Sequence, residues 1–184
     1  MNYKKTFNFL KSLPIKLNSF YKNKSNSLIK VNNKSKNKKN YDPVTNFDKS
    51  FEKYIRSLII KKFPNDSIIG EEFKDKVSNN NYQWSIDPID GTRAFVIGAP
   101  TWSNLISLSF NKKSKIGLAN FPELSKFFIN DQKKSYLYKN NKKKILKSSN
   151  NKNLKTVKII GNFHGTLSYE RQKRLLKNLV GLLD

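Results

Sequence analysis

Residues 87–92 read Asp-Pro-Ile-Asp-Gly-Thr, and they follow residues 82–86, which are predicted to form a β-strand. Asp87 and Asp90 lie three positions apart across what we expect to be a tight turn, so both carboxylates can face one pocket. The Ile89 carbonyl can point inward as a neutral oxygen ligand. An ordinary Asx-Pro turn has the same residue types, so the segment alone leaves a structural and a chemical interpretation open.

The second half of this segment suits a phosphate group. Pro88 stiffens the exit from the predicted strand. Gly91 lets the backbone approach a ligand closely, and Gly91 and Thr92 are predicted to open a helical turn whose free N–H groups can bind a phosphate. Metal ligands and a phosphate cradle are therefore predicted within six residues.

Acidic residues are concentrated around this segment, although the formal charge of the chain is +24. Most of the 13 Asp and Glu residues lie between residues 42 and 90, and Glu71, Asp87 and Asp90 end predicted strands or follow them. Carboxylates held close together repel one another unless cations bridge them. The chain has no cysteine, so ligation by oxygen is expected, which favours Mg²⁺, Mn²⁺ or Ca²⁺.

The high positive charge has two interpretations. It could serve a polyanionic partner, or it could reflect drift toward Lys and Asn codons, since arginine occurs only at Arg56, Arg93, Arg171 and Arg174. We favour drift, because specific nucleic-acid contacts prefer arginine.

No run approaches the ~20 apolar residues of a spanning helix. The acid-free residues 1–41 fit a transit peptide or a Lys-rich first helix, and we favour the helix.

Apolar spacing predicts the remaining elements. A helix is predicted over residues 7–21, kinked or divided at Pro14, and a second helix is capped by Thr45 or Asn46 and ends before Pro64. Residues 22–40 read as a loop or mobile flap with one edge strand at 28–31, and residues 42–45 read as a turn. Strands are predicted at 67–70, 82–86, 105–110, 116–121, 126–130, 135–138 and 157–161, and a last helix, with Ser168 as N-cap, at 168–183.

Three motifs in order resemble the inositol monophosphatase superfamily. Residues 87–95, Asp-Pro-Ile-Asp-Gly-Thr-Arg-Ala-Phe, resemble its signature. Residues 70–72, Gly-Glu-Glu, resemble its metal segment, and residues 42–48, Asp-Pro-Val-Thr-Asn-Phe-Asp, resemble its Pro-Val-Thr-x-x-Asp segment. Three ordered motifs at sensible spacing are far more specific than any one of them.

The resemblance implies a Mg²⁺-dependent phosphomonoesterase with two or three ions, for which Mn²⁺ is an alternative. Glu71, Asp87 and the Ile89 carbonyl would hold the first ion, Asp87 and Asp90 would share the second, and Glu71 would help to hold a third through water. The metals would lower the pKa of the attacking water and clamp the phosphate.

The resemblance also implies catalytic and phosphate-binding roles. Asp48 would hydrogen-bond Thr92, and this pair, with Glu71 as a further catalytic residue, would orient the attacking water. Gly91, Thr92 and Arg93 would contact the phosphate group, although Arg93 could instead pair with a surface acid.

Residues 93–95, Arg-Ala-Phe, followed by 98–102, Gly-Ala-Pro-Thr-Trp, resemble the histidinol-phosphatase branch more than the inositol branch. The implied protein is a cytoplasmic enzyme of histidine biosynthesis that acts on a small phosphorylated metabolite. No specific nucleic acid or membrane partner is expected, and a homodimer is possible. Inositol-1-monophosphatase, a non-catalytic relative that binds only metal or phosphate, and a basic nucleic-acid-binding module remain alternatives.

The family fold is α+β, layered α/β/α/β/α with an antiparallel sheet, and its second domain would be incomplete here. The expected divisions are a basic helix and flexible loop at 1–40, a metal- and phosphate-binding α+β domain at 41–150, and the start of a C-terminal α/β domain at 151–184. The family's late Trp-Asp segment has no match, since Trp84 and Trp102 precede serines. The second metal site would then lack a carboxylate, as expected for a fragment, a frameshifted gene or a chain completed by oligomerisation. His164 could approach a substrate or simply be exposed or packed.

Overall fold

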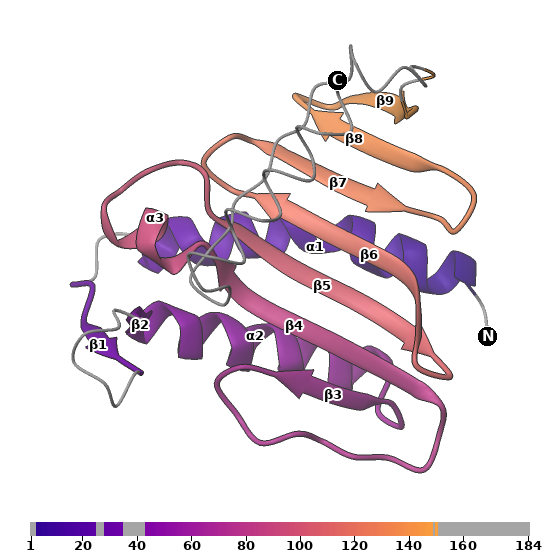
Figure 1. The fold of residues 1–184 in the computed structure, drawn as a ribbon, viewed down its shortest axis with the longest axis horizontal. Helices are drawn as coiled ribbons and strands as arrows, with labels where there is room; N and C mark the ends of the chain where they lie inside the picture. The colour runs from indigo at the N-terminus through magenta and orange to yellow at the C-terminus, as the bar shows by residue number, and fades with distance from the viewer. Residues whose placement is uncertain (1–2, 25–27, 35–42, 149, 151–184) are drawn as a thin grey trace, which may run out of the picture. The chain divides into compact units, whose positions relative to one another are not determined.

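The computed structural model describes residues 3–24, 28–34, 43–148 and 150. These residues form three helices, a small two-stranded sheet and a seven-stranded sheet (Figure 1). The helices are α1 (Tyr3–Lys24), α2 (Asn46–Lys62) and α3 (Thr92–Val96), and the small sheet pairs β1 (Val31–Asn33) with β2 (Pro43–Thr45). The predicted α+β fold class is confirmed.

The strands of the large sheet lie side by side in the order in which they occur along the chain. Its strands are β3 (Ser67–Gly70), β4 (Tyr82–Asp90), β5 (Ser103–Phe110), β6 (Lys113–Phe121), β7 (Lys126–Asn130), β8 (Ser135–Lys139) and β9 (Lys142–Leu146). Only β3 and β4 pair in parallel, and every later pair is antiparallel. The predicted meander is therefore present, with β9 as an additional edge strand that apolar alternation did not predict.

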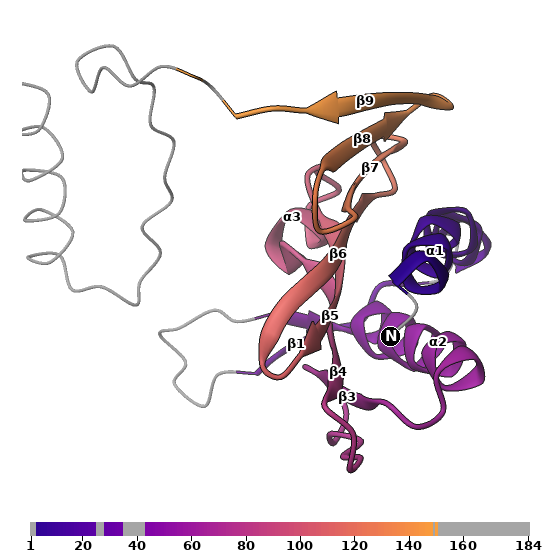
Figure 2. The same cartoon turned by 90° about the vertical axis from the view of Figure 1, so that its right-hand side faces the viewer.

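Helices α1 and α2 cover one face of this sheet, and the core lies between the helices and the sheet (Figure 2). Alternation along the strands points every second side chain to that face. The fully buried apolar side chains of this layer include Leu10, Leu13, Leu17, Phe51, Ile55, Ile59, Ile68, Trp84, Ile106 and Leu108. Of the layered arrangement expected from the family, the described residues contain one helical layer and one sheet.

Pro14 does not divide α1, so one of the two predicted effects of this proline is absent, while the other, a kink, stays a prediction. The helix runs unbroken from Tyr3 to Lys24 with Pro14 inside it and buried. Proline removes one helical hydrogen bond and crowds the preceding turn. Buried leucines on both sides of Pro14, Leu13 and Leu17, anchor the two turns to the same sheet, and we attribute the continuity of the helix to this packing.

Residues 43–45 form a strand rather than the predicted turn. In the β1–β2 pair, Val31 lies opposite Thr45 and Asn33 opposite Pro43. Proline is tolerated here because it occupies the first position of a short edge strand. The predicted edge strand at 28–31 begins later, at Val31. This small sheet leads Thr45 into the first turn of α2.

The expected tight turn at residues 87–90 is also wrong. Strand β4 continues through the segment to Asp90, with a register shift against β5 between Asp87 and Asp90. Such an irregularity re-aims side chains without ending the strand. The two carboxylates therefore lie on a distorted strand end.

Helix α1 belongs to the same compact unit as the sheet, and this unit extends from Met1 to Leu146. A second unit comprises Lys147–Asp184. The predicted strand at 157–161, the helix at 168–183 with Ser168, and His164 lie outside the described residues. Within the described part of the chain, no helix is both long and apolar enough to cross a bilayer.

Candidate metal and phosphate site

The Asp-Pro-Ile-Asp-Gly-Thr segment joins β4 to the short helix α3, as the sequence predicted for its second half. Gly91 is the residue before α3 and has φ 84°, in the left-handed region that favours glycine. Its carbonyl accepts a hydrogen bond from Phe95 N at 3.0 Å, which closes the first helical turn. A Cβ at Gly91 would meet only ordinary contacts, 3.6 Å from Trp102 Cα, so backbone conformation rather than space calls for glycine.

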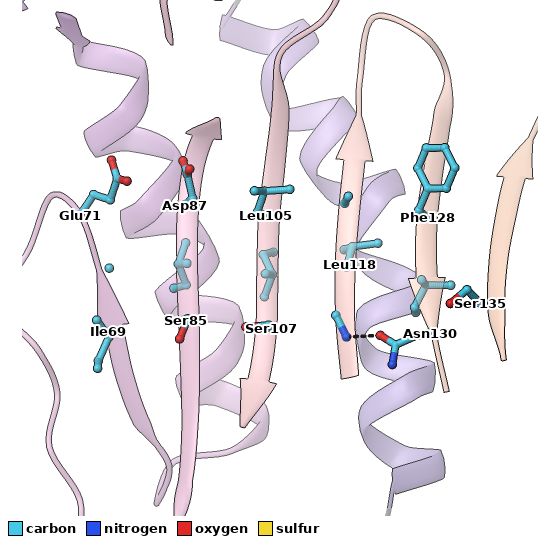
Figure 3. A pocket seen from close by; sticks show the side chains of 16 residues that line it. Ile69, Glu71, Ser85, Asp87, Leu105, Ser107, Leu118, Phe128, Asn130 and Ser135 are labelled. Atoms are coloured by element: carbon cyan, nitrogen blue, oxygen red, sulfur yellow. Dashed lines mark hydrogen bonds between the residues drawn. The ribbon is translucent and has the colours of Figure 1, made fainter. Parts of the chain in front are cut away.

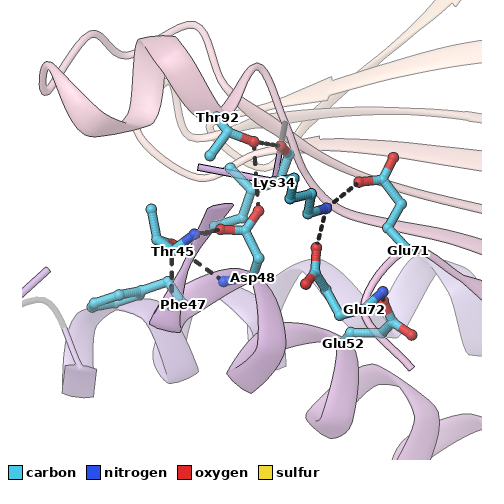
Figure 4. Close-up of polar contacts among 9 residues, drawn as sticks. Lys34, Thr45, Phe47, Asp48, Glu52, Glu71, Glu72 and Thr92 are labelled. Carbon is cyan, nitrogen blue, oxygen red and sulfur yellow. Dashed lines mark hydrogen bonds and ion pairs between the residues drawn. The ribbon is translucent and has the colours of Figure 1, made fainter. Parts of the chain in front are cut away.

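Thr92 is hydrogen-bonded toward both the strand end and α2 (Figure 4). Its hydroxyl lies 3.0 Å from the Ile89 carbonyl oxygen and 3.5 Å from Asp48 Oδ1. A hydroxyl has one hydrogen to donate, so the shorter contact to Ile89 is the stronger one here. The Asp48–Thr92 contact expected from the sequence is present, but at the long end of the hydrogen-bonding range, and Asp48 competes with the Ile89 carbonyl for the one hydroxyl hydrogen.

Asp48 is held in place by the residue that caps its own helix. It is 2% exposed, and its Oδ2 accepts hydrogen bonds from Thr45 N at 2.7 Å and Thr45 Oγ1 at 2.6 Å. The Thr45 hydroxyl in turn accepts from the backbone N–H groups of Phe47 and Asp48, which completes a capping box. The Asp48 carboxylate is thus fixed where it faces Thr92.

Glu71 and Asp87 line one end of a cavity of about 590 Å³ on the sheet face opposite the helices (Figure 3). Glu71 follows β3 and Asp87 lies near the end of the adjacent β4, so parallel pairing brings them side by side. Burial raises the pKa of Asp87 to about 7, and the charges of Glu71, Asp90 and Asp48 add to the effect. Ionisation of this carboxyl is therefore disfavoured unless a cation is near.

Asp90 and the Ile89 carbonyl are engaged with protein groups. Asp90 is exposed, and its Oδ2 accepts a hydrogen bond from the Ser103 hydroxyl at 3.2 Å, while the Ile89 oxygen accepts from Thr92. Within the described residues, no three His, Cys, Asp or Glu side chains are close enough together to hold a metal ion. The oxygen donors have the chemistry that hard cations prefer, and the predicted ligand set stays a prediction.

Lys34 was not predicted as a site residue, yet its ammonium group lies beside the Gly-Glu-Glu motif (Figure 4). It forms an ion pair with Glu71 Oε2 at 3.5 Å and a shorter one with Glu72. Burial lowers the pKa of Lys34, but hydrogen bonds and charge attraction from Glu72 and Glu71 outweigh that effect and raise it. Nothing distinguished Lys34 from its lysine-rich surroundings in the sequence. Arg93, which was predicted to contact the phosphate group, is exposed on α3.

The chain is similar to known proteins in its sequence and in its fold. A model of the inositol monophosphatase family matches residues 11–182. Histidinol-phosphatase of Chlorobaculum parvum is 42% identical over 91 residues, which are 50% of this chain and 35% of that protein. Inositol monophosphatase of Dictyostelium discoideum is 40% identical over 90 residues, which are 47% of this chain and 33% of that protein.

A solved structure of an IMPase/NADP phosphatase complexed with Mg²⁺ and phosphate has the same fold, with a TM-score of 0.65. The similarity covers 74% of this chain and 52% of that one, at 16% sequence identity. The aligned part of this chain spans about a third of the length of the two curated relatives.

Proposed function

Because the chain belongs to the inositol monophosphatase family, we propose that it provides the metal- and phosphate-binding part of a Mg²⁺-dependent phosphomonoesterase that hydrolyses histidinol phosphate. The observation that most supports this proposal is the Asp48–Thr92 hydrogen bond beside Asp87. It joins a buried carboxylate on α2 to the hydroxyl at the start of α3, next to the acidic end of the cavity.

In this proposal, some residues orient the attacking water and others bind the phosphate group. Asp48, fixed by Thr45, holds the Thr92 hydroxyl so that the pair orients an attacking water toward phosphorus. The N–H groups of Gly91 and Thr92 and the side chain of Arg93 would contact phosphate oxygens. No covalent phosphoenzyme is required.

Glu71, Asp87, Asp90 and the Ile89 carbonyl would hold the divalent cations. Bound metal would lower the pKa of the attacking water and stabilise charge on the leaving oxygen. Burial and the charges of neighbouring carboxylates raise the pKa of Asp87, and this supports the assignment, because a cation at that position would favour the ionised carboxylate. Glu71 carries a second task, as a catalytic residue next to the water.

The choice of histidinol phosphate rests on the Arg93-Ala94-Phe95 sequence and on the 42% identical relative. Inositol 1-phosphate is the second candidate, favoured by the 40% identical Dictyostelium protein. We also propose that the protein acts in the cytoplasm, binds a small phosphorylated metabolite and forms a homodimer.

The test is release of inorganic phosphate from histidinol phosphate and from inositol 1-phosphate, with Mg²⁺ and with EDTA. We expect Mg²⁺-dependent release that is faster with histidinol phosphate. Thr92→Ala should lower kcat by about 10²-fold or more, because the water loses its orienting hydroxyl. Thr92→Ser keeps the hydroxyl and serves as the control.

Three outcomes would contradict parts of the proposal. Equal turnover by Thr92→Ala and wild type would remove the assigned mechanism. Preference for inositol 1-phosphate would overturn the substrate. Release no faster than a metal-only blank, with circular dichroism showing a folded chain, would favour the alternative of a relative that binds metal or phosphate without catalysis.

A further inference from the structure

Glu52 is a charged residue at 0% exposure, and no step of the proposed chemistry uses it. It lies on α2 one turn after Asp48, so both carboxylates project from the same side of the helix. Burying a carboxylate is costly unless its oxygens are hydrogen-bonded. The partners of Glu52 therefore indicate why it is there.

Each oxygen of Glu52 has a defined partner. Oε1 accepts a hydrogen bond from Arg56 Nε at 2.7 Å, one turn further along α2. Oε2 accepts a hydrogen bond from the backbone N–H of Glu72 at 2.7 Å. The first bond fixes the carboxylate on the helix, and the second ties the chain just after β3 to that carboxylate. Figure 4 shows Glu52 beside Glu72.

Gly70 leaves the space that this carboxylate occupies. A Cβ at Gly70 would lie 2.2 Å from Glu52 Oε1 and 2.5 Å from its Cδ. The carboxylate is hydrogen-bonded on both sides, so it cannot move aside without breaking those bonds. Glu52 thus contacts the backbone on both sides of Glu71, at Gly70 and at Glu72.

We propose that Glu52 is a positioning residue, which holds the Gly70–Glu72 backbone against α2 so that the Glu71 carboxylate faces Asp87. The inference rests on the proposed function, because it assigns Glu71 to a divalent cation. The same helix then positions both parts of the site, with Asp48 directed at Thr92 and Glu52 directed at the Glu71 segment. Glu52 itself touches neither metal nor substrate.

The test is Mn²⁺ binding by the full chain, followed by electron paramagnetic resonance, for wild type and Glu52→Gln. Glutamine keeps the shape but loses the charge that holds both donors. We expect Mn²⁺ affinity to fall by about 10- to 100-fold, as is usual when the partner that orients a metal ligand is lost. Exchange of the Glu72 amide hydrogen should also become faster.

A matched control, Asp66→Asn, distinguishes a positioning role of Glu52 from a general contribution to the stability of the fold. Asp66 is also a buried carboxylate, and it accepts a hydrogen bond from Trp84 Nε1 at 2.9 Å just before the opposite end of β3. Asp66→Asn should lower the melting temperature as Glu52→Gln does, yet leave Mn²⁺ affinity and Glu72 exchange unchanged. If Glu52→Gln fails to fold, Glu52→Asp, which keeps the charge but shortens the reach, gives the same comparison.

Equal Mn²⁺ binding by wild type and the folded Glu52 variant, including no binding by either, would overturn the inference. An equal loss of affinity in Asp66→Asn would also overturn it, because a general loss of stability would then suffice. Failure of the proposed function looks different. Wild type would bind Mn²⁺ more tightly than Glu52→Gln and yet release no phosphate, which would support the positioning role alone.

Discussion

Asp87 lies near the end of β4 in surroundings that disfavour its negative charge. Burial and the charges of Glu71, Asp90 and Asp48 raise the pKa of Asp87 from 3.8 to about 7 in the folded chain. In the metal-free protein, the stabilisation from keeping this carboxyl protonated is fully present below about pH 4. It is lost as the pH rises through about 7, because the unfolded chain ionises first.

Asp87→Asn should therefore raise the free energy of unfolding of the metal-free protein. We expect a gain of about 1–2 kcal/mol at pH 8 that shrinks toward zero near pH 4, after a discount for the partial exposure of the side chain. Urea unfolding in EDTA at both pH values measures it. Asp75→Asn, at an exposed position, is the control. A loss of stability at pH 8 would contradict the assigned effect of burial and of the neighbouring charges on Asp87.

Motif order predicted the residues of the site better than their geometry. The Asp48–Thr92 contact was expected because two motifs, 44 residues apart, resemble those of a known family, and a glycine was expected to be needed at position 91, although for close approach to a ligand rather than for its left-handed backbone. Lys34 and Glu52 belong to no such assignment, and their contacts with Glu71 and Glu72 arise only when the chain folds. No periodicity distinguishes either residue from its neighbours.

At the scale of elements, the start of α2 depends on one side chain. Thr45 is 1% exposed, and its hydroxyl accepts from two backbone N–H groups and donates to Asp48. Thr45→Val keeps the volume but removes the hydroxyl, so we expect it to lower the free energy of unfolding by about 1–2 kcal/mol. Chemical denaturation measures the change.

Thr45→Ser is the converse variant, since it keeps the hydroxyl and removes a buried methyl group. If the capping hydrogen bonds contribute more than the packing of the methyl group, Thr45→Val should lower the free energy of unfolding more than Thr45→Ser does. The opposite order would show that Thr45 acts mainly as a packed side chain, and the fixed position of Asp48 would need another cause.

Helices and strands were predicted correctly where the spacing of apolar side chains determines the structure, and wrongly where backbone pairing determines it. The apolar alternation of β5 through β8 and the stripe of α2 identified those elements correctly. Strand β9 reads Lys-Lys-Lys-Ile-Leu and has no such alternation, because it is recruited as an edge through hydrogen bonds to β8. Residues 87–90 were predicted as a turn because Pro88 suggested one, although a strand irregularity also accommodates proline.

At the scale of the whole molecule, fold class was predictable and layering was not. The order of helices and strands indicates an α+β protein, and helices α1 and α2 do pack together on one face of the sheet. Which face they cover depends on register, and small or polar residues such as Ser85, Ser107 and Gly117 line the cavity on the other face. The acidic end of that cavity combines β3 with β4, strands separated by a loop in the sequence.

The most direct measurement of the metal site is calorimetric titration of Mg²⁺ into wild type and Asp87→Asn at pH 6.5, in two buffers with different ionisation enthalpies. Wild type should bind Mg²⁺ and release protons, because the cation displaces the proton favoured by the raised pKa of Asp87. Asp87→Asn should bind at least about tenfold more weakly and release fewer protons. Equal binding by both proteins, or none by wild type, would contradict the assignment of the Asp-Pro-Ile-Asp-Gly-Thr segment to a divalent cation.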